Sequence, residues 1–159
     1  MTGRPADWRL PFRLHDGFRS LRAEVSEDNV EIVKRGYALY LKGDMEGLAA
    51  LFASDAELAD AGGLGIAGTA AGTRHGPQGF LRGLEDTLEA FDDYRVEPQD
   101  FIDAGETVIV PVRISGRGRG SGVELDTQLA HLWVLRDGKV VRGEVYRSTE
   151  EALDRAGAE

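Results

Sequence analysis

The sequence predicts an α+β fold in which helices come first and an antiparallel sheet follows. In two segments, at about residues 30–52 and 80–91, apolar residues recur every three or four positions, which is the period of an amphipathic helix. From about residue 94, apolar and polar residues alternate, which is typical of a strand with one buried face. Short turns join these alternating segments, so they favour antiparallel pairing over the helical crossovers of a parallel sheet.

Two predicted helices open the domain. The first is expected to begin at Ser26, because the acidic residues that follow it suit the positive end of a helix dipole. Its apolar stripe runs from Val30 to Leu41, and Gly43 is a typical helix stop. Asp44 is placed to cap the second helix.

A third helix is expected after a short strand at residues 56–60 and a glycine-rich loop at residues 61–76. Pro77 suits the first position of a helix, where no helical hydrogen bond needs its N–H. The predicted apolar stripe of this helix consists of Phe80, Leu81, Leu84, Leu88 and Phe91.

The second half of the chain contains three long strand-like segments, at residues 108–115, 123–135 and 140–147. Asp137 and Gly138 separate the last two and form the strongest short-range hairpin signal in the sequence. A short helix is expected to close the chain. The order of these elements predicts a meander of strands.

Composition limits the partners that we expect. The formal net charge of −9 argues against binding to nucleic acid or to an anionic membrane, since both are polyanions. The chain has no cysteine, and no apolar run approaches the ~18 residues of a membrane span. Charged residues interrupt residues 1–25, which therefore do not resemble a secretory signal. We expect a cytoplasmic protein with an N-terminal arm at residues 1–25 and one domain at residues 26–156.

Three stretches of the chain resemble the SnoaL-like branch of the nuclear-transport-factor-2-like superfamily. They read NVEIVKRGYALYLKGDMEGLAALFASDAELAD, GPQGFLRGLEDTLEAFDDYRVEPQDFIDAG and LAHLWVLRDGKVVRGEVY. Polyketide cyclases, ketosteroid isomerases and limonene-type epoxide hydrolases share this fold. The resemblance implies a cone-shaped domain in which a curved sheet wraps around the helices and an apolar pocket lies between them.

The resemblance also implies two kinds of function, because this fold hosts both enzymes and ligand binders. The first is a pocket protein that binds or acts on a small apolar molecule, such as a polyketide-, terpenoid- or steroid-like compound. As an enzyme it would isomerise, cyclise or dehydrate its substrate by proton transfer, without a cofactor or a metal. The alternative is a non-catalytic ligand-binding or dimerisation module.

Asp60 is the candidate acid–base residue, because it falls where the isomerases of this superfamily carry their general base. A carboxylate at the mouth of an apolar pocket has its pKa raised by desolvation, which suits proton transfer near neutral pH. An aspartate that only turns the chain into the glycine-rich loop is the other interpretation. The donor positions of those isomerases fall on Gly36 and Ala130, which offer no side-chain proton. Tyr40 and Gln128 are possible substitutes.

The pocket wall is expected to combine the helical stripes with one face of each strand. Strand alternation then assigns the wall to Tyr40, Phe52, Leu84, Leu88, Val110, Val112, Gln128, Ala130, Leu132 and Val145.

The opposite face of the predicted sheet is expected to form a homodimer interface. It would carry Ile109, Pro111, Arg113, Leu129, His131, Trp133, Glu144 and Tyr146. This mixture of aromatic, aliphatic and a few charged residues is typical of the centre of an interface. The N-terminal arm could instead cover this face through Trp8, Phe12 and Phe18, and a β-bulge would reverse the assignment by shifting the register one residue.

Overall fold

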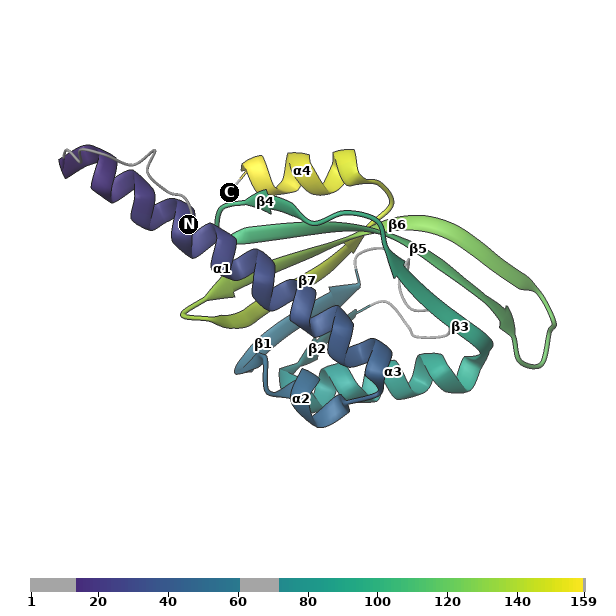
Figure 1. The fold of residues 1–159 in the computed structure, drawn as a ribbon. Coiled ribbons are helices and arrows are strands. Elements are labelled where there is room, and N and C mark those ends of the chain that lie inside the picture. Colours follow the sequence, from purple (N-terminus) through teal and green to yellow (C-terminus); the bar gives the residue numbers. More distant parts are fainter. Residues whose placement is uncertain (1–13, 61–71, 159) are drawn as a thin grey trace.

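The computed structural model describes the backbone of residues 14–60 and 72–158, and the side chains of residues 28–59 and 73–157. Within these residues a strongly curved sheet holds helices on its concave side and one helix on its convex side (Figure 1). The helices are α1 (Leu14–Lys42), α2 (Met45–Ala49), α3 (Gly76–Ala90) and α4 (Thr149–Ala158). The strands are β1 (Phe52–Asp60), β2 (Gly72–His75), β3 (Phe91–Pro98), β4 (Ile102–Ala104), β5 (Thr107–Gly118), β6 (Glu124–Arg136) and β7 (Lys139–Tyr146).

The sheet is mixed, and its strand order is β2-β1-β7-β6-β5-β3, with β4 paired to β5. The predicted α+β fold and the predicted meander of strands are confirmed. The prediction of a purely antiparallel sheet is wrong at one place, because β1 pairs with β7 in parallel. Parallel neighbours need a long connection, and here everything from β2 to β6 serves as that connection.

Helix α1 crosses the concave side of the sheet and begins at Leu14, so the predicted start at Ser26 is wrong (Figure 1). Acidic residues after a serine are compatible with a helix interior as well as with a helix start. Of the arm, Trp8 and Phe12 lie outside the described residues, and so does the side chain of Phe18. None of the described helices is long and apolar enough to cross a membrane.

Helix α3 begins where the sequence predicts, with Pro77 in its first turn. Its buried side includes Gly83, Leu84 and Thr87. Leu88 is 43% exposed, so its assignment to the pocket wall is wrong. Both Thr87 and Leu88 lie one turn after Leu84, and the helix turns Thr87 inward, where its hydroxyl donates to the Gly83 carbonyl at 2.9 Å.

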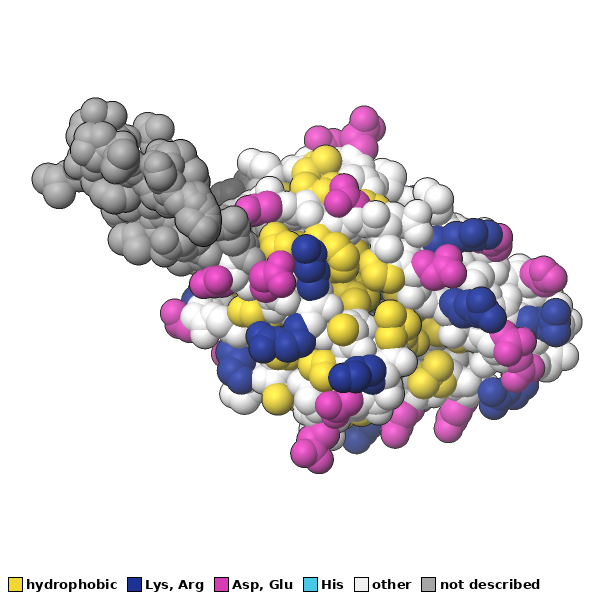
Figure 2. All heavy atoms as spheres, viewed as in Figure 1, with side chains coloured by type: hydrophobic (Ala, Val, Ile, Leu, Met, Phe, Trp, Pro, Cys, Tyr) yellow, Lys and Arg dark blue, Asp and Glu magenta, His cyan; other side chains and the backbone are white. Residues whose placement is uncertain are grey.

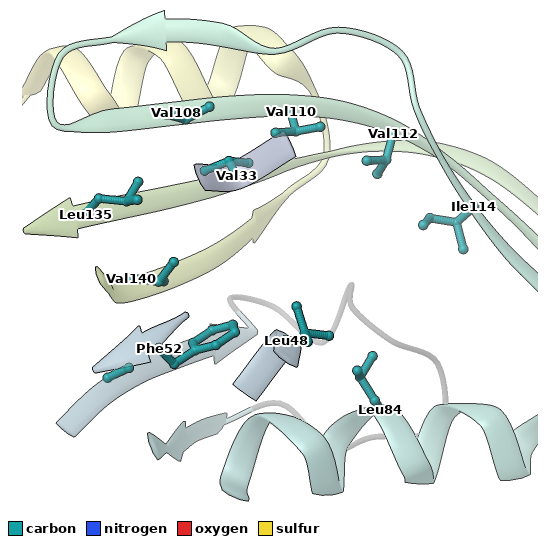
Figure 3. Packing of buried hydrophobic residues seen from close by; sticks show 11 residues of the cluster. Val33, Leu48, Phe52, Leu84, Val108, Val110, Val112, Ile114, Leu135 and Val140 are labelled. Carbon is teal, nitrogen blue, oxygen red and sulfur yellow. The ribbon is translucent and has the colours of Figure 1, made fainter. Parts of the chain in front are cut away.

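Two apolar clusters lie on the two faces of the sheet. The concave cluster joins the sheet to α1, α2 and α3 (Figure 3), and it consists of Val33, Leu48, Phe52, Ala56, Leu84, Val108, Val110, Val112, Ile114, Leu135 and Val140. The convex cluster lies against α4, and its buried members are Ile109, Ala130, Leu132 and Ala152. Alternation along β5 therefore divides its side chains as predicted, with Val110 on the concave side and Ile109 on the convex side.

The predicted facing of β6 is wrong, because it assumed an unbroken register between β6 and β7. Without a bulge, the hairpin would pair Ala130 with Val145, and both would face the helices. The register shifts between Val134 and Leu135, so that Val145 pairs with His131 and Ala130 pairs with Tyr146. Cross-strand partners share a face of the sheet.

The predicted wall positions Gln128, Ala130 and Leu132 therefore belong to the convex side, because they share one parity of β6. Ala130 and Leu132 are buried in the cluster against α4, and Gln128 is exposed beside Arg113. The expected outer face changes in the same way. Leu129, His131 and Trp133 face the helices, while Ile109 and Tyr146 contact the α4 cluster. The patch from which we predicted a dimer thus divides between two faces, and the homodimer itself stays a prediction.

Two glycines of the concave side should respond in opposite ways to alanine. A Cβ at Gly36, inside α1, would meet only Leu51 and Leu48, at 3.5 and 3.7 Å, which is ordinary contact. Gly36→Ala should raise the free energy of unfolding by about 0.5–1 kcal/mol, because glycine is a poor helix former. A Cβ at Gly143 would lie 2.6 Å from Trp133 Cζ3 and 2.9 Å from Leu58. Because of this collision, Gly143→Ala should lower the free energy of unfolding by about 1–3 kcal/mol.

Urea denaturation of both variants beside the unchanged protein gives the comparison. Equal effects of the two substitutions would contradict the packing described for α1 and β7.

Candidate functional site

A cavity of about 430 Å³ lies between the helices and the concave side of the sheet. Most of its wall is aliphatic or aromatic. Hydrophobic side chains also reach the surface between α1 and strands β3 and β5, with charged side chains around them (Figure 2). The wall consists of Ile32, Val33, Gly36, Tyr37, Tyr40, Leu48, Leu51, Phe52, Leu58, Ala59, Thr73, Arg74, Phe80, Gly83, Leu84, Tyr94, Val96, His131, Trp133, Val140, Gly143, Glu144 and Val145.

The structure places some of the predicted wall residues at this cavity. Tyr40, Phe52, Leu84 and Val145 line it. Val110 and Val112 are fully buried in the concave cluster but do not belong to the wall. Asp60 is the last residue of β1, directly after the wall residue Ala59, and its side chain lies outside the described residues.

A hydrogen-bonded group of three side chains ties α1 to β6 at the cavity. Trp133 Nε1 donates to the Tyr37 hydroxyl oxygen at 3.0 Å. The same oxygen lies 2.6 Å from His131 Nδ1. An indole N–H only donates, so the tyrosine oxygen accepts from Trp133. We assign the tyrosine proton to His131 Nδ1, because the Tyr37 hydroxyl has no other acceptor among the described residues. This assignment leaves the proton of the neutral imidazole on Nε2.

Burial keeps this group uncharged. It lowers the pKa of His131 to about 4, so the imidazole is neutral at physiological pH. Burial also raises the pKa of Tyr37 well above its ordinary value, and the hydrogen bond from Trp133 offsets only part of this rise. The site is thus a neutral, proton-bearing group in apolar surroundings.

Within the described part of the chain, His131 Nε2 makes no hydrogen bond. His131 lines the cavity, so its second nitrogen is a donor at the edge of an apolar space. A buried donor without a partner is costly, and such groups usually bind water or a ligand.

Aromatic rings surround Trp133 and fix its position. The rings of Phe52 and Phe80 stack with their centroids 4.4 Å apart. Both meet the Trp133 indole edge-on, at centroid distances of 6.1 Å for Phe52 and 6.4 Å for Phe80. The indole also lies against Gly143, where any larger residue would collide with it. Strand β7 thus supplies a glycine at the one position opposite the largest side chain of β6.

Two further tyrosines contribute phenol groups to the wall. Burial raises the pKa of both Tyr40 and Tyr94, and the nearby Tyr40 raises that of Tyr94 further. Neither hydroxyl is hydrogen-bonded to another described residue. They are neutral donors that a ligand oxygen could use.

Carboxylates are scarce along the described part of the wall. Glu144 belongs to it, but its carboxylate accepts hydrogen bonds from Arg142 Nε and from the Tyr146 hydroxyl, both at 2.5 Å. Its cross-strand partner is Leu132, which faces the convex cluster. Among residues whose side chains are described, no group of three or more histidine and acidic side chains could hold a metal ion.

Sequence reasoning missed Tyr37, His131 and Trp133 as a group. The alternation of β5 holds the signal, because Val110 faces the helices and pairs with His131. On α1, Tyr37 lies one turn before Tyr40, which was assigned to the wall correctly. The bulge on β7 concealed the connection.

Comparison with known proteins gives the same architecture. A family model described as a SnoaL-like domain matches residues 33–143. An NTF2-like protein from Burkholderia xenovorans is 30% identical, with a TM-score of 0.65 over 82% of this chain and 95% of that chain. TerC, crystallised with polyporic acid, is 26% identical, with a TM-score of 0.65 over 82% and 98% of the two chains.

A protein from Sinorhizobium meliloti, described as a candidate polyketide cyclase, is 25% identical to this chain. Its TM-score is 0.58, over 72% of this chain and 93% of that chain. No functionally curated protein matches significantly. The SnoaL-like model covers well over half of the sequence, and the solved structures share its curved sheet and helices. The chain therefore belongs to the SnoaL-like family and has the NTF2-like (nuclear-transport-factor-2-like) fold.

Proposed function

We propose that this protein binds a small, largely apolar molecule in the cavity and holds an oxygen atom of that molecule through His131 Nε2–H. The observation that carries this proposal is the Trp133–Tyr37–His131 chain of hydrogen bonds, which leaves a fixed donor at an apolar wall. The low pKa of His131 keeps the imidazole neutral across the physiological pH range, and a Tyr37 hydroxyl that donates to Nδ1 favours the tautomer protonated at Nε2.

The cavity has the properties of a small-molecule site. Its volume of about 430 Å³ lies within the usual range for ligand pockets, and a few polar groups interrupt an apolar wall. The co-crystallisation of TerC with polyporic acid and the cyclase description of the Sinorhizobium protein support a polyketide-like or other ring-containing ligand. A terpenoid or a steroid-like compound has the same combination of rings and few oxygens.

A catalytic role is the second candidate, with Asp60 as the acid–base group. The observation in its favour is positional, since Leu58 and Ala59 line the cavity and Asp60 follows them on β1. Within the described wall the Glu144 carboxylate is already bound by Arg142 and Tyr146. A cofactor-independent isomerase, cyclase or dehydratase would then use Asp60 to remove a proton while His131 holds the substrate oxygen.

His131→Asn should weaken binding of a ketone probe selectively. The asparagine amide can still accept from Tyr37 near the position of Nδ1, but the Nε2 donor is lost. The probe pair is prodan, a naphthyl ketone, and N-phenyl-1-naphthylamine, which has no carbonyl. We expect prodan affinity to fall about three- to tenfold, the effect of one hydrogen bond, with little change for the amine.

Fluorescence titration measures both affinities. His75→Asn is the matched control, because His75 is exposed before α3 and does not belong to the wall. Equal losses of both probes in His131→Asn, or the same prodan loss in His75→Asn, would contradict the proposed donor.

The free energy of unfolding should fall as the pH decreases from about 6.5 to about 4, and His131→Asn should reduce this dependence. The pKa of His131 is about 4 in the folded protein, below its ordinary value of 6.5. In this window the unfolded chain takes up a proton that the folded chain does not, so the stabilisation present above pH 6.5 is lost on acidification. Urea denaturation at several pH values tests this, and equal slopes in the variant and the unchanged protein would refute a buried neutral imidazole.

Asp60→Asn tests the catalytic candidate. The probe is 5-nitrobenzisoxazole, in which a base takes the ring C–H proton, a nitrile forms and the N–O bond breaks to release a phenolate. A carboxylate in an apolar cavity should accelerate this reaction, and its loss should cost about a hundredfold. Absorbance of the phenolate gives the rate. A rate in the Asp60→Asn variant equal to that of the unchanged protein would exclude Asp60 as the base, while retained prodan binding would leave the binding proposal intact.

A further inference from the structure

Arg74 is the one cationic residue in the described wall of the cavity. It lies on β2, just before α3, and its side chain is 34% exposed. Its stem crosses Gly83, where a Cβ would lie 3.2 Å from both Cδ and Nε of the arginine. The absence of a side chain at Gly83 therefore lets the guanidinium lie at the cavity rather than outside α3.

The hydrogen bonds of Arg74 leave most of its donors available. Nη2 donates to Asp86 Oδ2 at 3.1 Å. Of its five N–H groups, no other is hydrogen-bonded within the described residues. Asp86 is itself 47% exposed, and an exposed ion pair of this kind contributes little to stability. The pair orients one edge of the guanidinium and leaves the other free for an anion.

Strand pairing places Arg74 in line with the Trp133 side of the cavity. Arg74 pairs with Leu58, Leu58 with Gly143, and Gly143 with Trp133. These residues form one row across four strands, so the Cα atoms of Arg74 and Trp133 lie about 14 Å apart, or three strand spacings. Both residues line the cavity, and a molecule with two or three rings would span the distance between them.

An anion in this cavity needs a local cation, because the chain as a whole repels it. The formal net charge is −9, and the one carboxylate known on the described wall, Glu144, is already paired with Arg142. A guanidinium binds a carboxylate through two parallel N–H bonds, which are stronger than neutral hydrogen bonds.

We infer that the ligand is an acid: a ring-containing molecule whose carboxylate, or other anionic oxygen group, is bound by Arg74 while a neutral oxygen accepts from His131. This inference rests on the proposed function and adds the class of ligand to it. Arg74 then determines specificity, since an uncharged analogue of the ligand would leave the guanidinium facing an apolar space.

Two naphthalene probes of nearly the same shape separate charge from shape. N-phenyl-1-naphthylamine is neutral, and 1-anilinonaphthalene-8-sulfonate adds one anionic group to the same skeleton. In the full-length protein, Arg74→Gln should reduce affinity for the sulfonate about tenfold and change affinity for the neutral amine less than twofold. Energy transfer from Trp133, in a Trp8→Phe background, shows that each probe occupies this cavity.

Arg82→Gln is the matched control, because it removes the same charge from an exposed position of α3 outside the cavity wall. It should change neither affinity more than twofold. If Arg74→Gln still binds N-phenyl-1-naphthylamine, the variant is folded. If Arg74→Gln loses affinity for the neutral amine as well, Arg74→Met is used as the test variant instead, since methionine keeps an unbranched side chain over Gly83.

The two proposals fail in different ways. An unchanged ratio of sulfonate to amine affinity in the Arg74 variants, or an equal loss in Arg82→Gln, overturns the anion site and leaves the ligand-binding function standing. Failure of the unchanged protein to bind either probe overturns the proposed function, and the anion site with it.

Discussion

The β-bulge between β6 and β7 is the constraint on which the cavity depends. Because one extra residue lies on β7, Val145 pairs with His131 instead of Ala130. The bulge turns Gly143 and Val145 of β7 toward the helices, on the same side as Trp133 and His131 of β6. These two rings face the helices because they pair with Val108 and Val110 of β5, and there they meet Tyr37 of α1. A bulge is one of the few local features that can invert the facing of part of a strand without changing the rest of the sheet. Here it places Gly143 opposite Trp133 and Val145 opposite His131 at the wall.

The three-ring group also explains how a long helix stays on a curved sheet while space remains beneath it. Tyr37 accepts from Trp133 and, as assigned, donates to His131. Within the described residues, the ring nitrogens and hydroxyl of these three side chains therefore all have partners except His131 Nε2. Phe52 and Phe80 hold the indole, and Gly143 leaves room for it. Stability and the proposed ligand recognition thus use the same side chains, and the unpaired nitrogen is the part that a bound molecule would satisfy.

The polar groups of the wall are few and lie on different elements. His131 comes from β6, Tyr40 from α1, Tyr94 from β3 and Arg74 from β2. Such a distribution suits recognition of one molecule by several of its edges, with apolar side chains supplying most of the contact area. The SnoaL-like family shares this architecture across different activities, so the activity of a member depends on which groups its wall carries.

The sequence alone determined the α+β class, the start of α3 at Pro77 and the alternation of β5, because propensity and period act locally. It also assigned Tyr40, Phe52, Leu84 and Val145 to the wall correctly. The facing of Ala130 and His131 depended on how β6 pairs with β5, and the bulge on β7 hid that register from a count along the hairpin. The inward turn of Thr87 in place of Leu88 depended on packing against β1. Only the tertiary structure brought together Tyr37 and Trp133, 96 residues apart, since a hydrogen bond between distant segments leaves no period in either of them.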